Sequence, residues 1–326
     1  MEKEMKLKRM SEIDAEEVKW LWYPYIPFGK ITIIQGDPGE GKTTLGLRLS
    51  AACSNGDVLP NMEKCKPITV IYQTAEDGLG DTVKPRLTEA HANENIIFNI
   101  CEDDDVLTLN DERIESAIKQ TGAKLVIFDP IQGYVGSDTD INRANEIRTV
   151  MRRISKIAEE TGCAIVFIGH LNKLKGTSSA YRGLGSIDFR ASARSVLLVG
   201  RLSEAPNVRV IVHDKSSLAP EGKSMAFNLG NDEGFYWLDG YDDVTADELL
   251  CGNQKETKTE AAEELLRELF SKQDSYPSKW IQEKAEEKNI SHRTLNIAKS
   301  KMKIFNSVKV GEQWFWVKKN DKQSIK

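Results

Sequence analysis

The chain has 326 residues, of which 40% are hydrophobic and 29% charged, and its formal net charge is −5. This length predicts one large and one small domain, and the composition is that of an ordinary soluble globular protein. It excludes a membrane-spanning protein, because no apolar run approaches the roughly 18 residues that a span needs. The N-terminus lacks the apolar stretch of a secretory signal, and five cysteines without a CxxC pair predict reduced thiols, no zinc site and a cytoplasmic location.

The charge is unevenly divided along the chain. Residues 253–326 hold 16 Lys or Arg and 11 Asp or Glu, a net charge of +5, whereas residues 1–252 carry a net charge of −10. A basic end on an acidic body indicates a polyanion partner for that end, and a solubilising tail is the alternative.

Short β-branched runs alternate with helical patterns over the first 241 residues. Fully apolar strands separated by amphipathic helices predict an α/β fold with a mostly parallel sheet covered on both faces. The predicted strands cover residues 31–35, 69–74, 96–100, 125–129, 164–169, 195–199 and 208–213, and the predicted helices cover 42–53, 110–121 and 142–161.

The pattern changes after residue 241. Residues 242–258 are polar and acidic and are predicted to be a linker. Apolar residues at helical spacing then predict helices over 259–273 and 277–289, the second with Ser278 as its N-cap.

The rest of the chain predicts one more helix and a β-hairpin. Ser291 is placed to cap the third helix, and residues 308–317 alternate about a turn at Gly311. Three helices followed by a hairpin form the winged-helix plan. We therefore expect a small α+β domain at 259–320, after a P-loop domain at 1–241.

The most specific motif is a P-loop that follows the first predicted strand and opens a helix. Its glycines let backbone N–H groups surround phosphate oxygens, and the helix N-terminus adds partial positive charge. Lys42 is expected to neutralise the β- and γ-phosphates, and the Thr43 hydroxyl to bind Mg²⁺. The motif predicts an ATPase with ATP and Mg²⁺ as cofactors. The predicted nucleotide-binding residues are Gly36, Asp37, Pro38, Gly39, Glu40, Gly41, Lys42, Thr43 and Thr44.

An apolar strand over 125–129 ends in Asp129, which fits a Walker B acid that holds the Mg²⁺. Pro130 follows it, so the carboxylate that activates water does not come next in the chain. We expect that carboxylate at Glu76, with Asp77 as its neighbour, after a strand predicted to lie beside the P-loop strand.

Two further features are less specific. His170 ends a predicted strand and is expected to sense the γ-phosphate, although a lone histidine is more often structural. The Gly/Ser-rich, basic segment 174–195 predicts contact with single-stranded DNA, and an ordinary surface loop is the alternative. The DNA-contacting residues expected in and beside this segment are Lys173, Lys175 and Arg182.

Taken in order, these motifs resemble RecA-type ATPases related to plasmid replicative helicases of the RepA kind. The resemblance covers about residues 24–240 and is carried by the P-loop, the 75–77 turn, Asp129, Gly169–His170 and the segment 181–183. It implies a RecA-like fold and a homo-oligomer, most simply a hexamer.

The resemblance also implies roles for individual residues. Glu76 would be the catalytic carboxylate and His170 the γ-phosphate sensor. Arg194 would be the arginine finger that reaches the next subunit's ATP, with Arg190 and Arg201 as competing candidates. Lys215 would be its companion cation, although Ser217 stands where the wider class often has the arginine of a K-x-R pair.

The sequence as a whole predicts a DNA-associated, helicase-like ATPase of phage, plasmid or mobile-element replication. The alternatives are an ATP-switched DNA-binding regulator or initiator, and a RecA-like recombination mediator. Single-stranded DNA is expected at the core loops, and duplex DNA at the C-terminal domain through Arg293, Lys299 and Lys301. Protein docking is the alternative for that domain.

Overall fold

The computed structural model describes residues 7–62, 65–102, 105–136, 144–171, 187–202, 205–230, 234–251, 254–302, 304–311 and 313–319. The chain forms two compact units, one of Met1–Gly200 with Ile211–Met225 and one of Arg201–Val210 with Ala226–Lys326. The predicted domain boundaries around residues 242–258 stay a prediction. Among the described helices, none is long and apolar enough to cross a membrane.

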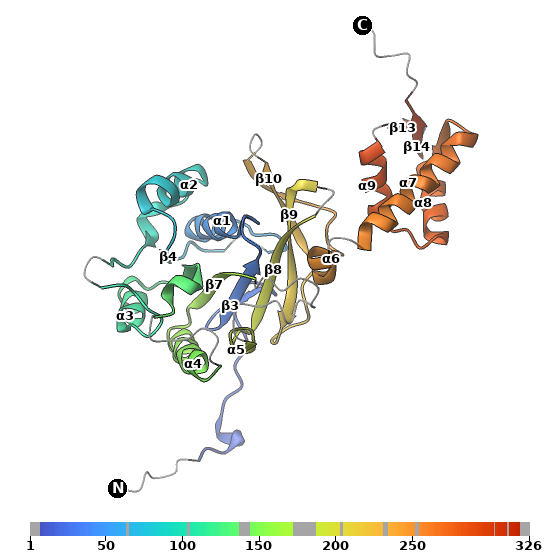
Figure 1. The fold of residues 1–326 in the computed structure, drawn as a ribbon. Coiled ribbons are helices and arrows are strands. Elements are labelled where there is room, and N and C mark those ends of the chain that lie inside the picture. Colours follow the sequence, from blue (N-terminus) through green and yellow to red (C-terminus); the bar gives the residue numbers. More distant parts are fainter. Residues whose placement is uncertain are drawn as a thin grey trace, which may run out of the picture. The chain divides into compact units, whose positions relative to one another are not determined.

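The described residues contain a nine-stranded sheet in the order β11-β10-β9-β8-β3-β7-β6-β4-β5 (Figure 1). The six strands from β8 to β5 run parallel to one another, and β10 and β11 are antiparallel. This confirms the predicted α/β fold with a mostly parallel sheet. The strands are β3 (Ile31–Gly36), β4 (Val70–Thr74), β5 (Ile97–Phe98), β6 (Leu125–Asp129), β7 (Ala164–His170), β8 (Ser195–Leu202), β9 (Ala205–Ser216), β10 (Met225–Gly230) and β11 (Gly234–Leu238).

Helices lie on both faces of the parallel strands (Figure 1). They are α1 (Lys42–Asn55), α2 (Lys84–Glu89), α3 (Glu112–Thr121), α4 (Ala144–Thr161) and α5 (Ile187–Ser192). Because both faces are covered, every residue of β3 and β6 is buried, which explains the continuous apolar runs in the sequence.

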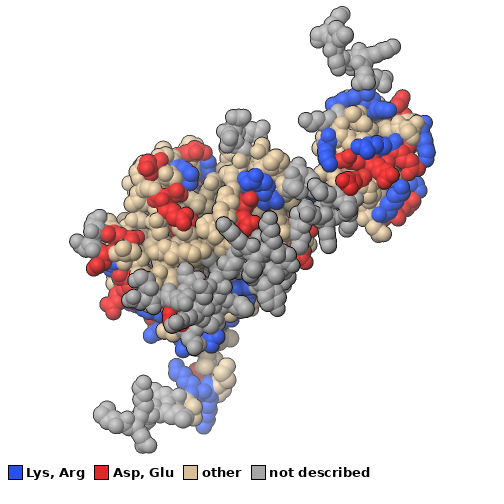
Figure 2. Space-filling model, in the orientation of Figure 1, with Lys and Arg blue, Asp and Glu red and all other residues tan. Residues whose placement is uncertain are grey.

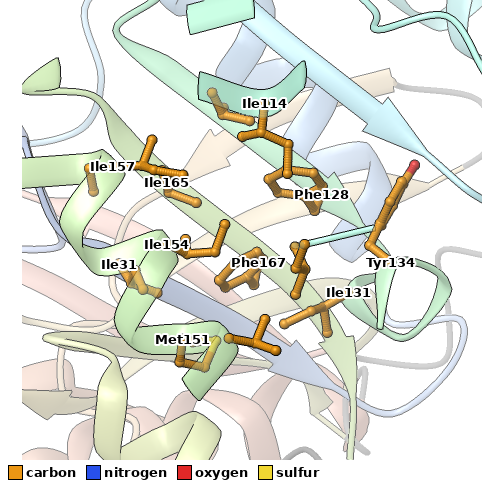
Figure 3. Close-up of a cluster of buried hydrophobic side chains, with 14 of the residues drawn as sticks. Ile31, Ile114, Phe128, Ile131, Tyr134, Met151, Ile154, Ile157, Ile165 and Phe167 are labelled. Atoms are coloured by element: carbon orange, nitrogen blue, oxygen red, sulfur yellow. The ribbon is translucent and has the colours of Figure 1, made fainter. Parts of the chain in front are cut away.

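A hydrophobic cluster lies between the sheet and helices α3 and α4 (Figure 3). Alternate strand residues such as Phe128 and Phe167 are fully buried there, against Met151 and Ile154 of α4. Burial of a side chain of this size contributes about 1.5–3 kcal/mol, so this cluster holds the strand ends of the parallel sheet in place.

Several elements before residue 242 differ from the prediction, and α2, β10 and β11 were not predicted. The predicted strand at 96–100 is only β5, preceded by a 3-10 turn, and α5 forms inside the segment predicted to be a loop. Short strands rich in aromatic residues and interrupted by proline or glycine carry little periodicity, which is why the hairpin of β1 (Trp20–Trp22) and β2 (Ile26–Pro27) escaped prediction. The short helical turns are η1 (Met10–Glu12), η2 (Leu79–Val83), η3 (Glu94–Ile96) and η4 (Ile131–Tyr134).

A buried histidine lies under the N-terminal hairpin. His213 is 3% exposed, its Nε2 lies 3.0 Å from Ser195 Oγ, and its Nδ1 accepts a hydrogen bond of 2.9 Å from the Gly222 N–H. Burial lowers the pKa of His213 to about 4, so the ring is neutral at physiological pH. Residue 222 must be glycine, since a Cβ there would lie 2.5 Å from the ring of Tyr25.

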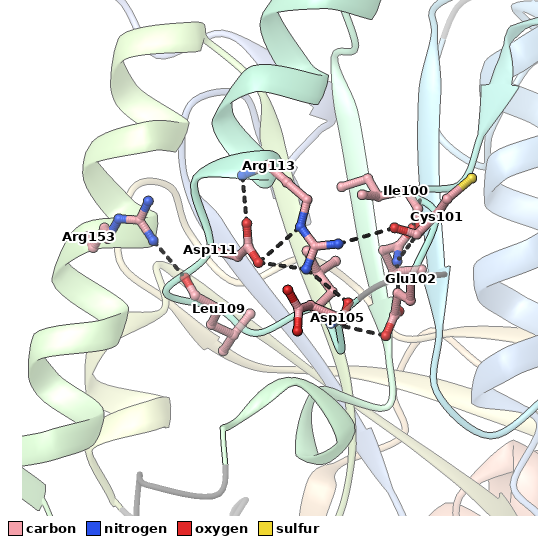
Figure 4. A network of polar contacts seen from close by, with 10 residues as sticks. Ile100, Cys101, Glu102, Asp105, Leu109, Asp111, Arg113 and Arg153 are labelled. Atoms are coloured by element: carbon pink, nitrogen blue, oxygen red, sulfur yellow. Dashed lines mark hydrogen bonds and ion pairs between the residues drawn. The ribbon is translucent and has the colours of Figure 1, made fainter.

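An arginine network fixes the loop that precedes α3 (Figure 4). Arg113 donates to the Asp111 carboxylate at 2.7 and 3.0 Å and to the carbonyls of Cys101 and Asp105 at 3.2 and 3.0 Å. Asp111 also caps α3 by accepting from the Arg113 N–H at 2.8 Å. Glu102 extends the network to the Leu107 N–H at 3.0 Å.

The C-terminal part of the chain forms a second, smaller hydrophobic core. Its three-stranded sheet has the order β12-β14-β13, and its core includes Leu266, Ile281, Leu295 and Trp316. This arrangement is compatible with the predicted winged-helix plan. The elements are α6 (Ala246–Cys251), α7 (Gln254–Lys272), β12 (Ser275–Pro277), α8 (Ser278–Glu287), α9 (His292–Met302), β13 (Phe305–Val310) and β14 (Gln313–Lys318).

The local predictions for this part were mostly confirmed. Ser291 Oγ accepts from the Thr294 N–H at 3.2 Å and caps α9, and Gly311 turns the hairpin with a φ of 63°. The prediction of Ser278 as an N-cap was wrong, because Ser278 is the first helical residue and Pro277 takes the cap position. The segment predicted as a linker contains α6 and the start of α7.

Candidate active site

The P-loop joins β3 to α1 as predicted. Gly39 and Gly41 have φ angles of 78° and 80°, which glycine adopts without steric cost. Gly41 is the N-cap of α1, and no side chain among the described residues caps this helix. The first N–H groups of α1 therefore stay available to an anion. Gly36 is required for a different reason, since a Cβ there would lie 2.1 Å from the carbonyl oxygen of Val199.

Lys42 lies inside this loop. It is 4% exposed, and its Nζ donates a hydrogen bond of 2.7 Å to the Asp37 carbonyl. Burial lowers its pKa, while the nearby charges of Asp129, Glu40 and Glu76 act in the opposite direction. A buried ammonium beside a ring of backbone N–H groups fits the oxygens of a polyphosphate.

Asp129 ends β6 beside the start of α1. It is 5% exposed, accepts a hydrogen bond of 2.7 Å from the Tyr72 hydroxyl, and also accepts one from the Thr43 side chain. Burial raises its pKa, and both hydrogen bonds lower it. A buried carboxylate next to a threonine hydroxyl fits Mg²⁺, which proteins bind through one or two side chains together with substrate phosphates and water. The described residues contain no denser cluster of metal-ligating side chains.

The prediction that the strand before Glu76 lies beside the P-loop strand was wrong. Strands β7 and β6 separate β4 from β3. Periodicity identifies strands but not their order in the sheet, so this separation could not be predicted from the pattern. The turn after β4 is nevertheless joined to β6, because the Ala75 N–H donates a hydrogen bond of 3.0 Å to the Asp129 carbonyl. This contact brings Glu76 close to the P-loop.

The two carboxylates of this turn face different neighbours. Glu76 is exposed, and its charge acts on Lys42 and His170. Asp77 lies 3.4 Å from Arg86, and its N–H donates to Thr74 Oγ1 at 3.1 Å. Glu76 is thus placed toward the phosphate side, which favours it as the carboxylate that orients water. Its catalytic role stays a prediction.

His170 is the last residue of β7 and lies opposite Gly36 in the register of β3 and β7. Its Nδ1 is buried and has no hydrogen-bond partner within the described part of the chain. Burial and the charge of Lys42 lower its pKa, so a neutral ring is favoured. His170 thus lies beside the first P-loop glycine, and its role as the γ-phosphate sensor stays a prediction.

The cations predicted to act on a neighbouring subunit differ in how they are held. Arg190 pairs with Asp214, and Lys215 Nζ donates to the carbonyls of Arg190 and Ala193 at 2.7 and 2.8 Å. Lys215 therefore closes the C-terminal end of α5. Arg194 is exposed, as is the alternative candidate Arg201.

The basic residues predicted to contact DNA on α9 all have partners in their own unit. The Arg293 side chain is 12% exposed and lies 3.5 Å from Asp243, with the Tyr241 ring 5.2 Å away. Lys301 lies 3.0 Å from Glu263. Lys299 donates to Ser307 and lies 4.2 Å from the centre of the Trp316 ring. The residues predicted in the core segment, Lys173, Lys175 and Arg182, lie outside the described residues.

The surface of this C-terminal part agrees with those contacts. On the face shown in Figure 2, its acidic and basic side chains lie next to one another rather than in one basic patch. To contact DNA, Arg293, Lys299 and Lys301 would have to exchange their present partners for phosphates.

Tyr72 was missed by the sequence reasoning. In the strand VIYQT it has the pattern of an ordinary core aromatic, and no motif marks its hydroxyl. Only the contact with Asp129 distinguishes it.

A family model described as AAA domain matches residues 4–176. Among curated proteins, the DNA repair protein RadA of Bacillus subtilis (strain 168) is 29% identical over 147 residues, which cover 44% of this chain and 28% of RadA. RadA of Streptococcus pyogenes serotype M3 is 26% identical over 158 residues, which cover 48% and 31%. The chain thus spans less than a third of the length of these relatives.

Two solved structures have a similar arrangement. A DnaB-like replicative helicase, described with its interactions with primase, has 18% sequence identity and a TM-score of 0.48 over 64% of this chain and 56% of that one. The second structure, described as an ATPase domain, has 17% identity and a TM-score of 0.49 over 64% and 85%.

Proposed function

Because the chain belongs to the AAA domain family, whose model matches more than half of it, we propose that it binds Mg·ATP and hydrolyses it in association with DNA. Its core is that of a RecA-like P-loop ATPase, as predicted. The observation that carries the proposal is the meeting of Lys42, Thr43 and Asp129 at the N-terminus of α1. These residues supply a phosphate-binding ammonium, a hydroxyl and a buried carboxylate in one place.

The residues of the chain have separate tasks in this proposal. Lys42 and the N–H groups of the loop hold the β- and γ-phosphates, exchanging the Asp37 carbonyl for phosphate oxygens. Thr43 and Asp129 would hold Mg²⁺, which would neutralise charge on the phosphates. Glu76 orients the attacking water and accepts its proton, and the neutral His170 donates a hydrogen bond to the γ-phosphate.

The association with DNA is supported by the curated relatives, which are DNA repair proteins by name. The ordered motifs that resemble plasmid replicative helicases support helicase-like action in mobile-element replication. We expect single-stranded DNA to contact the segment that holds Lys173, Lys175 and Arg182.

We expect several copies of the chain to assemble, because the P-loop leaves one side of the γ-phosphate uncovered. P-loop enzymes of this kind complete the site with a cation, and Arg194 is exposed on a fixed backbone. We expect a ring, with six subunits as the simplest form, in which Arg194 reaches the ATP of the next subunit.

A RecA-like recombination mediator is the second candidate, and the likeness to proteins named for DNA repair favours it. One experiment separates the candidates, namely ATP hydrolysis with no DNA, single-stranded DNA and duplex DNA, together with the particle mass. Stimulation by single-stranded DNA with a ring mass supports the helicase-like enzyme, whereas ATP-dependent filaments on DNA support the mediator. Duplex binding with negligible turnover would instead indicate an ATP-switched regulator, and absence of ATP binding would refute the proposal.

A further inference from the structure

The hydroxyl of Tyr72 contacts the acid that the proposed function assigns to the metal. Tyr72 lies in β4, is 2% exposed, and donates a hydrogen bond of 2.7 Å to Asp129 Oδ2. The donor and acceptor belong to adjacent parallel strands, since β4 pairs with β6 and residue 74 lies opposite Asp129. The hydrogen bond from Tyr72 to Asp129 therefore links two paired strands, β4 and β6, rather than two loops.

The packing around α1 makes room for this tyrosine. At Gly46, in the middle of α1, an added Cβ would lie 2.8 Å from Ile168 Cδ1 and 3.5 Å from the Tyr72 ring. Glycine inside a helix costs roughly 0.5–1 kcal/mol relative to alanine. The helix that carries Lys42 and Thr43 thus has its weakest helix former where it passes over the Tyr72 ring.

A buried tyrosine does not acquire such a partner automatically. Tyr134, 1% exposed and close to Phe128, has a hydroxyl with no hydrogen-bond partner among the described residues. Tyr72 differs because its hydroxyl meets a carboxylate, and a hydrogen bond to a charged acceptor is stronger than one between neutral groups.

Asp129 has a second hydrogen-bond donor, Thr43, which the proposed function also assigns to the metal. A hydroxyl that binds a cation through an oxygen lone pair can still donate its hydrogen, so Thr43 can contact both the cation and Asp129. The bond from Tyr72 lies on the β4 side and need not change. Tyr72 would then hold the carboxylate from the strand, independently of the phosphate-binding helix that carries Thr43.

We propose that Tyr72 is a positioning residue for the divalent cation of Mg·ATP, whose hydroxyl fixes the orientation of the Asp129 carboxylate. This rests on the proposed function, because it assumes that Asp129 meets the cation. Partners that orient a metal ligand typically contribute about 10- to 100-fold to metal affinity. Tyr72→Phe removes only the hydroxyl and keeps the ring under Gly46.

The test uses the full chain with Tyr72→Phe and a matched control, Tyr25→Phe. Tyr25 is also buried, 1% exposed, and its hydroxyl donates 2.7 Å to the Lys223 carbonyl, away from the P-loop. Mn²⁺ binding in the presence of ATP is measured by electron paramagnetic resonance, and binding of a fluorescent ATP analogue is measured in Mg²⁺ and in EDTA. We expect Tyr72→Phe to weaken Mn²⁺ binding about tenfold and to leave analogue binding in EDTA unchanged.

The Tyr25→Phe protein should match the wild type in all three titrations. The inference is overturned if Tyr72→Phe binds Mn²⁺ within twofold of the wild type, if it loses as much affinity in EDTA as in Mg²⁺, or if Tyr25→Phe loses Mn²⁺ equally. Wild-type protein that binds no analogue in either condition refutes the proposed function itself, and the role of Tyr72 with it. Wild-type protein that binds the analogue equally well with and without Mg²⁺, and takes up no Mn²⁺, overturns only the assignment of Asp129 and Tyr72 to a cation.

Discussion

The charged residues of the P-loop site and those of helix α9 are held in different ways. Lys42 is buried beside a backbone carbonyl, with a partly compensated charge and a pKa lowered by burial. Lys301 of α9 is instead exposed and lies 3.0 Å from the Glu263 carboxylate. Arg293 of the same helix is largely buried, as Lys42 is, but its guanidinium lies 3.5 Å from the Asp243 carboxylate, and its nitrogens have no hydrogen bond among the described residues. A buried charge that lacks a full partner is costly, so its presence at Lys42 indicates a ligand that supplies one, whereas the exposed ion pair of Lys301 contributes little and indicates no ligand.

The largest expected effect is that of removing the buried ammonium. Lys42→Ala should abolish Mg·ATP binding or slow hydrolysis about 10³-fold or more, because several kcal/mol of phosphate stabilisation is lost. The measurement is steady-state phosphate release together with nucleotide titration. Lys30→Ala is the control, since Lys30 forms a surface pair of 2.8 Å with Glu159 and should leave the rate unchanged. Unaltered hydrolysis by the Lys42→Ala protein would show that this P-loop is not the site of ATP hydrolysis.

The next effect concerns the carboxylate. Glu76→Gln should bind ATP normally and hydrolyse it about 10²-fold more slowly, since the amide cannot accept a proton from water. Single-turnover hydrolysis and analogue binding are to be measured in parallel. Asp77→Asn is the matched control, because Asp77 faces Arg86 instead. If Asp77→Asn shows the slow phenotype and Glu76→Gln does not, the two roles are exchanged.

A mixing experiment tests whether one molecule completes the site of another. Arg194→Ala and Lys42→Ala proteins should each be inactive, and an equimolar mixture should regain activity at roughly a quarter of its sites, where an intact P-loop meets an intact arginine. Phosphate release after mixing is the readout. A mixture of Arg201→Ala with Lys42→Ala shows whether the other exposed arginine does this instead. Mixtures that stay inactive would contradict a cation supplied in trans.

His213 is a buried titratable group outside the P-loop site, and it should make the stability of the core depend on pH. The pKa of His213 is about 4, below the ordinary value of 6.5, so the unfolded chain binds the proton first as the pH falls. The free energy of unfolding should therefore fall as the pH drops from 6.5 toward 4, by about 1 kcal/mol between pH 7.5 and 5.5. Urea titrations at both pH values measure it.

Two substitutions separate this group from the other titrating residues. His213→Gln should lose that part of the pH dependence. His292→Gln should keep it, because His292 lies exposed on α9 with Glu286 2.9 Å away. Equal pH dependence in the wild type and His213→Gln would show that another group is responsible.

The smallest effect is expected on α9. If duplex DNA binds there, Arg293→Ala with Lys301→Ala should weaken binding only a few-fold, because both side chains must first leave Asp243 and Glu263. The slope of affinity against salt should fall by about 1 for each phosphate contact removed. The measurement is duplex titration of the full chain at two salt concentrations. Unchanged affinity and slope would favour a protein-docking role for this domain.

The parts that the sequence predicted well are those fixed by local chemistry. The P-loop spacing places Lys42 and Thr43 because each residue type follows from backbone geometry, and β6 begins and ends at the predicted residues 125 and 129. The neighbours of β4 in the sheet were not predictable, since strand order depends on crossover connections. The partners of Arg293 were not predictable either, because composition gives the charge of a segment and not its contacts. Tyr72 looks like any core aromatic until Asp129 is seen beside it.

The backbone of Arg194 has a mechanical consequence. Its N–H donates to the Ile31 carbonyl at 2.9 Å, and its own carbonyl accepts from the Ser217 N–H at 2.9 Å. Ile31 begins the strand that ends in the P-loop of the same molecule. Any shift of that strand on phosphate binding would therefore reach the backbone of Arg194 through one hydrogen bond. In a ring where Arg194 reaches the ATP of the next subunit, nucleotide binding in one subunit would thereby control when the next subunit hydrolyses ATP.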